Sequence, residues 1–155
     1  MIQLTATILQ LVVFIAYIWY IVKRFGVLES ISDSTYNLEG SSRAWFLGFL
    51  GSIGILNLAQ PMGMFGAIAM ALLWFTGTTI SHKSPNGYTR IIHIISAVGA
   101  ISISFVGLFI LHGLWIPSAI VVAIAPVIYL KDRSRFVWWV ECVAFIALIT
   151  TYFIL

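Results

Sequence analysis

Residues 91–112 read IIHIISAVGAISISFVGLFILH, a run that contains no Asp, Glu, Lys or Arg. A helix needs about 20 predominantly apolar residues to cross the hydrocarbon core of a bilayer, and this run is long enough to do so. The surface helices of soluble domains, by contrast, carry charged and polar residues on the face opposite their apolar stripe. The run therefore predicts a membrane-spanning helix and decides the class of the fold.

Five further apolar runs approach the same length. The six predicted helices occupy residues 4–22, 44–60, 62–80, 91–112, 114–130 and 136–155. Of the 155 residues, 61% are hydrophobic and 8% are charged, and the mean hydropathy is +1.07. This composition excludes a water-soluble domain. We expect an all-α, polytopic membrane protein, in which a bundle of six transmembrane helices forms one domain over residues 1–155 and is surrounded by the lipid bilayer.

The basic residues lie on one side of this predicted topology. All eight fall in or beside alternate connections: Lys23, Arg24, Arg43, Lys83, Arg90, Lys131, Arg133 and Arg135. Cytoplasmic connections of membrane proteins carry an excess of Lys and Arg. We therefore expect the loop 23–43 to be cytoplasmic and both termini to be extracytoplasmic. Because the basic residues border apolar runs, lipid headgroups explain the net charge of +3, and no nucleic-acid partner is expected.

Small residues recur in the second run, where Gly48, Gly51 and Gly54 are evenly spaced. Small side chains let helix backbones approach closely in lipid. The glycines therefore predict a closely packed helix. They leave open whether the packing lies within the bundle, in a helix–helix oligomer or in a larger membrane complex.

Two ionisable residues lie inside the predicted helices, His93 in the fourth and Glu141 in the sixth. A charge near the bilayer centre costs at least about 2.5 kcal/mol, so such residues usually pair or serve a function. Both lie toward the basic end of their helices. We expect them to pair, to share a proton or to ligate a cation; the alternative is that they only cross-link two helices.

The loop 23–43 reads KRFGVLESISDSTYNLEGSSR and lies on the same side as these two residues. Ser32 and Asp33 stand at the centre of its polar segment. We expect both to join His93 and Glu141 in one site, with the loop closing over an ion or a lipid headgroup. The alternative is that Ser and Asp side chains cap a short interfacial helix, which is their common role at helix starts.

A metal centre is a further hypothesis for this side of the protein. His82 ends the third predicted helix there, so His82, His93, Glu141 and Asp33 together offer three or four ligands for a divalent metal such as zinc, which accepts imidazole and carboxylate groups. No HExxH motif supports it. The single cysteine, Cys142, excludes a disulfide framework and a cysteine-rich metal site.

Three short motifs resemble a known group of proteins. The segment 30–36, SISDSTY, resembles a motif of small, uncharacterised six-helix membrane proteins of bacteria and their phages, and 31–33 also resembles the DRAM-type six-helix family. In the small proteins a His precedes a Ser-Ala pair, similar to His93 with 96–97, and a Trp-x-Glu stands in the last helix, similar to 139–141. The resemblance implies a six-helix fold in a bacterial plasma membrane and a site at these motifs, but no activity.

These observations predict a small membrane protein that binds or transports a small ion or a lipid headgroup at a cytoplasmic-face site. Two alternatives remain open. One is a membrane-embedded, metal-dependent lipid hydrolase, similar in concept to the ceramidase-like superfamily, although the paired His of that group is missing from the last helix. The other is a non-catalytic accessory subunit of a larger membrane complex.

Overall fold

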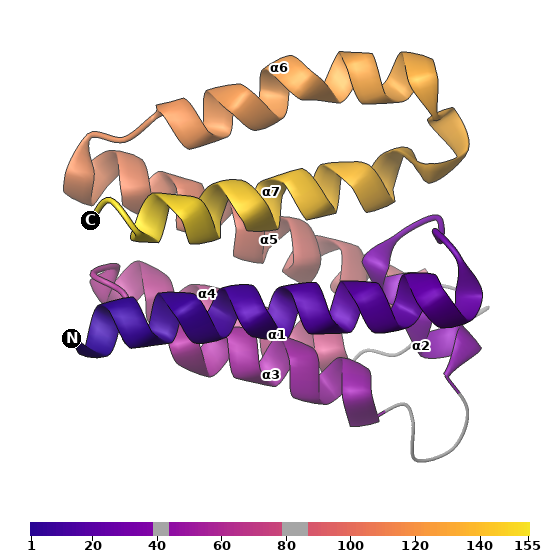
Figure 1. The fold of residues 1–155 in the computed structure, drawn as a ribbon, viewed down its shortest axis with the longest axis horizontal. Helices are drawn as coiled ribbons and strands as arrows, with labels where there is room; N and C mark the ends of the chain where they lie inside the picture. The colour runs from indigo at the N-terminus through magenta and orange to yellow at the C-terminus, as the bar shows by residue number, and fades with distance from the viewer. Residues whose placement is uncertain (39–43, 79–86) are drawn as a thin grey trace.

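A computed structural model describes residues 1–38, 44–78 and 87–155, and the described residues are helical without any strand. This confirms the all-α prediction. Six long helices lie side by side along one direction (Figure 1). Their bounds are α1 (Ile2–Phe25), α3 (Ala44–Asn57), α4 (Gly63–Thr78), α5 (Gly87–His112), α6 (Ile116–Lys131) and α7 (Phe136–Tyr152).

Short elements fill two of the connections. The 3₁₀ helix η1 (Ile31–Asp33) and the short helix α2 (Ser34–Asn37) follow α1, and the 3₁₀ helix η3 (Arg133–Arg135) joins α6 to α7. The predicted helix at 44–60 is too long, because α3 ends at Asn57 and turns follow it up to Pro61, which has no backbone N–H to continue a helix. The helix predicted at 91–112 begins earlier, at Gly87.

Three of the helices are long and apolar enough to cross a membrane. These segments are Ile2–Phe25, Ile91–His112 and Arg133–Tyr152. The helices α3, α4 and α6 are also apolar but shorter; the 14 residues of α3 extend about 21 Å at the usual rise of an α-helix, against a hydrocarbon core about 30 Å thick. The structure thus supports an integral membrane protein with at least three candidate spans among the described residues.

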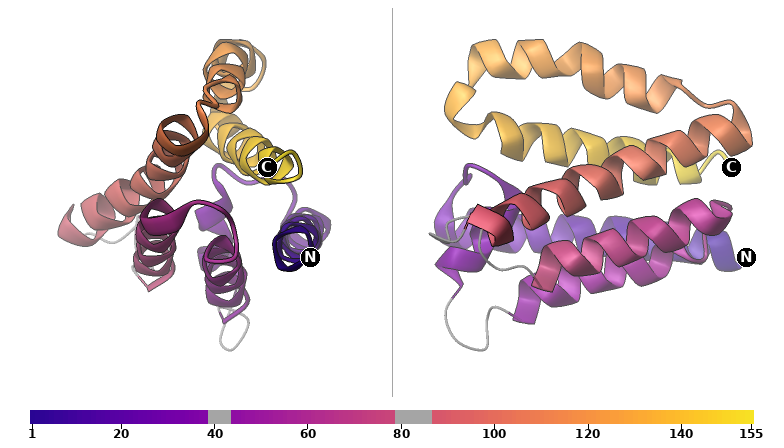
Figure 2. Two further views of the ribbon diagram at one scale, coloured as in Figure 1. Left: turned by 90° about the vertical axis from the view of Figure 1, so that its left-hand side faces the viewer. Right: turned by 180° about the vertical axis from the view of Figure 1, so that it is seen from behind.

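Helix α1 packs against helices from both halves of the chain. It lies between α3 and α7, while α4 packs against both α3 and α5. The helix α6 packs along α7 and lies at one edge of the bundle (Figure 2). Both termini lie at one end, and the α1–α2 and α6–α7 connections lie at the other (Figure 1). The basic residues Lys23, Arg24 and Arg133 therefore share one end, whereas Arg43 and Lys83 lie outside the described residues.

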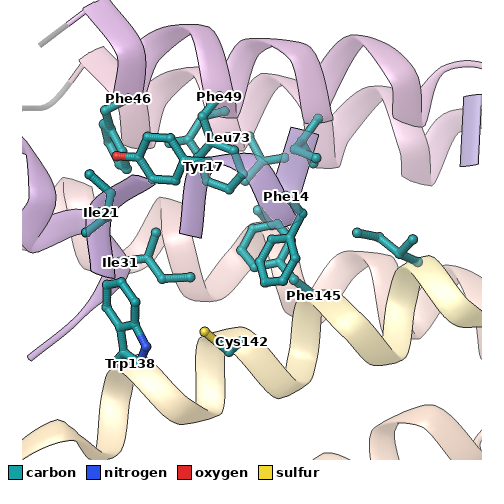
Figure 3. Close-up of a cluster of buried hydrophobic side chains, with 14 of the residues drawn as sticks. Phe14, Tyr17, Ile21, Ile31, Phe46, Phe49, Leu73, Trp138, Cys142 and Phe145 are labelled. Carbon is teal, nitrogen blue, oxygen red and sulfur yellow. The ribbon is translucent and has the colours of Figure 1, made fainter. Parts of the chain in front are cut away.

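Aromatic side chains hold α1, α3 and α7 together. Tyr17 stacks on Phe49 with ring centroids 4.2 Å apart, and Phe14 stacks on Phe145 at 5.4 Å (Figure 3). Such pairs contribute about 0.5–1.5 kcal/mol each beyond the burial of their area. At the end where the termini lie, Gln3 Nε2 donates to the carbonyl oxygen of Tyr152 at 3.4 Å. This packing fixes the first helix against the last one and so positions the loop that follows α1.

The glycines differ in what surrounds them. A Cβ added at Gly54 would lie 3.1 Å from Met70 Cγ, so this residue is packed as predicted. The tightest approach is elsewhere, at Gly107, where a Cβ would lie 2.7 Å from atoms of Met62 and Phe65. Gly48 does not pack within the described bundle, because a Cβ there would meet nothing within 4 Å. Of the three predicted glycines, Gly54 is thus closely packed and Gly48 borders open space.

A candidate polar site around Glu141

The loop after α1 begins with a left-handed glycine and a helix cap. Gly26 ends α1 with a φ of 79°, a value that favours glycine. Ser30 then caps η1: the Asp33 N–H donates to Ser30 Oγ at 3.2 Å, and the Ser30 N–H donates to Asp33 Oδ2 at 3.1 Å. This reciprocal arrangement is a capping box, as a Ser followed three residues later by an acidic residue predicts. The capping role considered for Asp33 is therefore confirmed.

This turn is bound to the start of α7 by two hydrogen bonds. The Ile31 N–H donates to Glu141 Oε2 at 2.7 Å, and the Trp138 N–H donates to the carbonyl oxygen of Glu29 at 3.0 Å. Ile31 and Trp138 are both buried. The loop therefore packs into the bundle at these residues, and the Glu141 carboxylate has a main-chain donor as its partner.

Two carboxylates meet consecutive backbone amides in this arrangement. The N–H of Ser30 donates to Asp33, and the next N–H, that of Ile31, donates to Glu141. The structure thus brings Asp33 and Glu141, two of the predicted site residues, to one turn. Asp33 is buried, whereas Glu141 is only partly buried.

Hydroxyl groups of three residues hydrogen-bond within and beside the turn at η1. Tyr17 Oη and Ser34 Oγ are 2.5 Å apart, and Ser34 Oγ donates to the carbonyl oxygen of Ile31 at 2.7 Å. Thr35 Oγ1 donates to the carbonyl oxygen of Ser32 at 2.8 Å. Because Tyr17 also stacks on Phe49, the turn is tied to the aromatic core. Its main chain is preorganised to receive the Glu141 carboxylate.

A small cavity lies beside Glu141. Its volume is about 30 Å³, and three polar residues reach it: Ser32, Thr76 and Glu141. Apolar side chains form the rest of its wall, among them Leu73, Ile101 and Phe145. Ser32 is one of the predicted site residues. Thr76 was missed, and the signal available for it was a hydroxyl residue within an apolar run.

His93 is the predicted site residue of α5. It is buried in α5, and its carbonyl oxygen accepts a hydrogen bond from Ser96 Oγ at 3.1 Å. Ser96 Oγ in turn accepts from Thr76 Oγ1 at 3.1 Å, which links α5 to α4. The described residues that line the cavity beside Glu141 include Ala97 but not His93. Thr76 thus connects the turn of α5 that carries His93 to the cavity.

The predicted metal ligands do not form one group within the described structure. His82 lies outside the described residues. Among the residues that are described, no three His, Cys, Asp or Glu side chains gather as a metal site would require. His112 belongs to the other end of the bundle, where its Nε2 lies 2.7 Å from the carbonyl oxygen of Pro61.

A second polar cluster, which the sequence analysis missed, joins α1 to the end of α3. Gln10 Nε2 donates to Asn57 Oδ1 at 2.8 Å, and Gln60 Nε2 donates to Gln10 Oε1 at 3.0 Å. Gln60 and Thr7 are linked as well, at 3.2 Å. All four side chains are buried. The available signal was a glutamine in the middle of the first apolar run, since a buried amide requires hydrogen-bond partners.

A second cavity lies beside this cluster. Its volume is about 20 Å³, and its polar lining residues are Gln10, Asn57, Ser104 and Tyr152. It shares three apolar lining residues with the cavity beside Glu141: Leu73, Ile101 and Phe145. The two cavities are therefore neighbours inside the bundle, with these three side chains between them.

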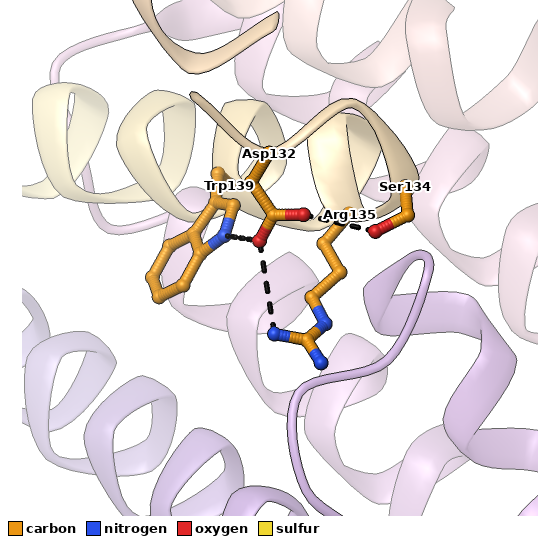
Figure 4. A network of polar contacts seen from close by, with 4 residues as sticks. All are labelled: Asp132, Ser134, Arg135 and Trp139. Carbon is orange, nitrogen blue, oxygen red and sulfur yellow. Dashed lines mark hydrogen bonds and ion pairs between the residues drawn. The ribbon is translucent and has the colours of Figure 1, made fainter. Parts of the chain in front are cut away.

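The connection between α6 and α7 carries a separate polar network at the surface. Trp139 Nε1 donates to Asp132 Oδ2 at 3.2 Å, Ser134 Oγ donates to Asp132 Oδ1 at 2.9 Å, and the Arg135 guanidinium lies 3.8 Å from Asp132 (Figure 4). The hydrogen bond from Trp139 is the main cause that lowers the pKa of Asp132 below its ordinary value. The network fixes this connection.

Comparison with known proteins finds no match to the chain, whether among protein-family models, curated proteins or solved structures. Interpretation of the site therefore depends on its own geometry.

Proposed function

We propose that this protein is a small polytopic protein of a bacterial plasma membrane that binds protons at Glu141 and conducts them across the bilayer. In this proposal all six long helices cross the membrane, both termini are extracytoplasmic, and Glu141 faces the cytoplasmic side. One observation carries the proposal: a carboxylate inside a helical bundle borders the first of two adjoining, partly polar cavities.

The position of Glu141 supports a role beyond packing. Carboxylates within membrane-spanning segments are rare and commonly mark ion pathways and proton relays. Here Glu141 lies in α7, and its Oε2 is bound by the Ile31 N–H. The same residue lines the cavity with Ser32 and Thr76, whose hydroxyl groups can donate and accept hydrogen bonds.

The size of the two cavities favours the proton over other small ions. To hold one water molecule, a cavity needs at least about 10–15 Å³ of space that the centre of a water molecule can occupy. Cavities of about 30 and 20 Å³ therefore suit one water each. A metal ion with its hydration shell and a lipid headgroup are both larger. A proton, passed between water and a carboxylate, fits.

In this proposal the apolar side chains between the two cavities form the barrier that must open for protons to pass. Leu73, Ile101 and Phe145 interrupt the polar lining, so water does not run continuously from Glu141 to Gln10 in this conformation. Conduction requires these side chains to move apart and admit water. Glu141 would take a proton from water on the cytoplasmic side and return it to water in the opened path, or act in the reverse direction.

The alternatives have less support in the described structure. A metal-dependent lipid hydrolase needs three ligands at one point, and the described His, Cys, Asp and Glu residues form no such group. An accessory subunit needs no cavities beside a carboxylate. Proton conduction uses the carboxylate, both cavities and the polar cluster at Gln10.

The proposal is tested with purified protein in liposomes that contain a pH-sensitive dye, where a potassium gradient and valinomycin drive proton entry. We expect wild-type protein to acidify the lumen and Glu141→Gln to lose this activity. The amide oxygen of glutamine can still accept from the Ile31 N–H, so the variant should fold. Glu29→Gln is the matched control, because the Glu29 side chain is exposed and only its carbonyl oxygen contacts α7. Proton flux equal to that of empty liposomes, or unchanged flux in Glu141→Gln, would overturn the proposal.

A further inference from the structure

The outer surface between α1 and α3 contains a groove of about 820 Å³, far larger than either internal cavity. Its lining residues come from these two helices: Val13, Ala16, Tyr17, Trp19, Tyr20, Arg24, Ala44, Trp45, Gly48, Phe49 and Ser52. Most are apolar or small. The bilayer is the phase that faces such a surface in a membrane protein, so the groove is suited to an acyl chain.

The floor of the groove is open down to the backbone. Ala44, Gly48 and Ser52 are four residues apart and follow one face of α3, and Ala16 lies opposite on α1. A Cβ added at Gly48 would meet nothing within 4 Å. Gly48 therefore does not serve the packing of the described helices, and none of the described residues fills the space next to it.

One end of the groove carries a positive charge on an aromatic support. Arg24 Nη1 donates to the Tyr20 hydroxyl at 2.7 Å, and the guanidinium lies 5.3 Å from the Phe25 ring. The Tyr20 ring lies 6.1 Å from that of Trp45, which is 65% exposed. These contacts hold Arg24 at the groove's mouth, at the end of the bundle where the other described basic residues lie.

We propose that this groove binds one anionic phospholipid, with an acyl chain over Ala16 and Gly48 and the phosphate on Arg24. A guanidinium presents five N–H donors in a fork that matches phosphate oxygens, and the bond to Tyr20 uses only part of this capacity. Trp and Tyr side chains favour the depth of lipid headgroups, which sets Trp45 and Tyr20 beside the phosphate. The cation selects lipids with net negative charge over zwitterionic ones. This inference does not depend on proton conduction.

The test is native mass spectrometry of the full chain released from micelles with added phosphatidylglycerol or phosphatidylcholine. We expect bound phosphatidylglycerol at one molecule per chain and less phosphatidylcholine at equal concentration. Arg24→Gln should weaken phosphatidylglycerol binding about fivefold, the effect expected for one basic residue near an anionic lipid. Arg133→Gln is the matched control, because the Arg133 guanidinium lies 5.2 Å from the Tyr129 ring at the same end of the bundle but lines no part of the groove.

A second variant tests the groove separately from the charge. Gly48→Leu adds a side chain at a position where a Cβ meets nothing within 4 Å and should reduce binding of the acyl chain, whereas Ala123→Leu adds the same kind of side chain at an exposed position of α6 and should not. Equal weakening by Arg24→Gln and Arg133→Gln would overturn the proposal, because it would indicate attraction to the surface charge alone. Equal binding of the two lipids, or full binding by Gly48→Leu, would also overturn it.

Discussion

The Glu141 carboxylate accepts a 2.7 Å hydrogen bond from the main-chain N–H of Ile31, which stands 110 residues earlier in the chain. This bond joins the last helix to the loop after the first one. It gives Glu141 both a structural partner and a place on a cavity wall, and the two roles can be separated by substitution.

Replacement of Glu141 by Ala should destabilise the protein, whereas Glu141→Gln should not. Alanine leaves the buried Ile31 N–H without its acceptor, and an unsatisfied buried donor costs about 1–3 kcal/mol. Glutamine keeps a carbonyl oxygen at the same place. The free energy of unfolding in detergent, measured with Glu29→Ala as the control at an exposed position, distinguishes the two. Equal stability of Glu141→Ala and wild type would contradict this account.

Gly107→Ala should be far more disruptive than Gly48→Ala. A Cβ at Gly107 would lie 2.7 Å from Phe65 Cβ, which is close to the backbone of α4 and cannot move aside by a rotamer change, whereas the Gly48 position is open. Overpacking of this kind costs about 1–3 kcal/mol. Thermal unfolding of the two variants in the same detergent provides the comparison. Similar melting temperatures would mean that α4 and α5 separate easily.

The pKa of Asp132 should rise toward its ordinary value of 3.8 when Trp139 is replaced by Phe, because the indole hydrogen bond is the main cause of its lowering. A carboxyl group with a lowered pKa in the folded protein stabilises the fold at pH values above 3.8, and this contribution is lost as the pH falls through the folded-state pKa. The ¹³C resonance of the Asp132 carboxyl group, titrated in both proteins, measures the change. An unchanged titration in Trp139→Phe would assign the lowering to Ser134 and Arg135.

The predicted orientation can be tested by cysteine labelling in a Cys142→Ala background. Ser118 begins α6, and Ser134 lies in the connection between α6 and α7, so the two mark opposite ends of one helix. With extracytoplasmic termini, an impermeant thiol reagent should label Ser118→Cys in intact bacterial cells and Ser134→Cys only after permeabilisation. The reverse pattern would invert the topology and move Glu141 to the extracytoplasmic side.

The helices and the loop cap could be predicted from the sequence because their signals are local. A long apolar run predicts a helix whatever surrounds it, and Ser30 with Asp33 three residues later predicts a capping box. The ends were less accurate, since α3 stops at Asn57, ahead of Pro61, and not at residue 60. The hydrogen bond from Gln10 of α1 to Asn57 is a tertiary contact that the residues around 57 do not reveal.

The composition of the site could be predicted only in part. Lipid is as apolar as a buried side chain, so hydrophobicity does not mark which face of a membrane helix points inward. The sequence therefore identified Glu141, Ser32 and Asp33 as polar residues near one end, but it could not tell that Thr76 borders the cavity. For the same reason the sequence could not tell that Gly54 packs within the bundle and Gly48 does not, since a small residue serves equally in a close helix contact and in an open groove.

The contacts of α1 with α7 also constrain how the chain is assembled during synthesis. Aromatic stacking, the Gln3–Tyr152 bond and the Ile31–Glu141 bond all connect segments separated by more than a hundred residues. Because a chain is made from its N-terminus, the first helix is complete long before its partner α7 exists, and Gln10 is made before Asn57, which satisfies its buried amide. The turn at Ile31 likewise has its Glu141 acceptor only once α7 has been made, so the contacts that close the bundle depend on the last part of the chain.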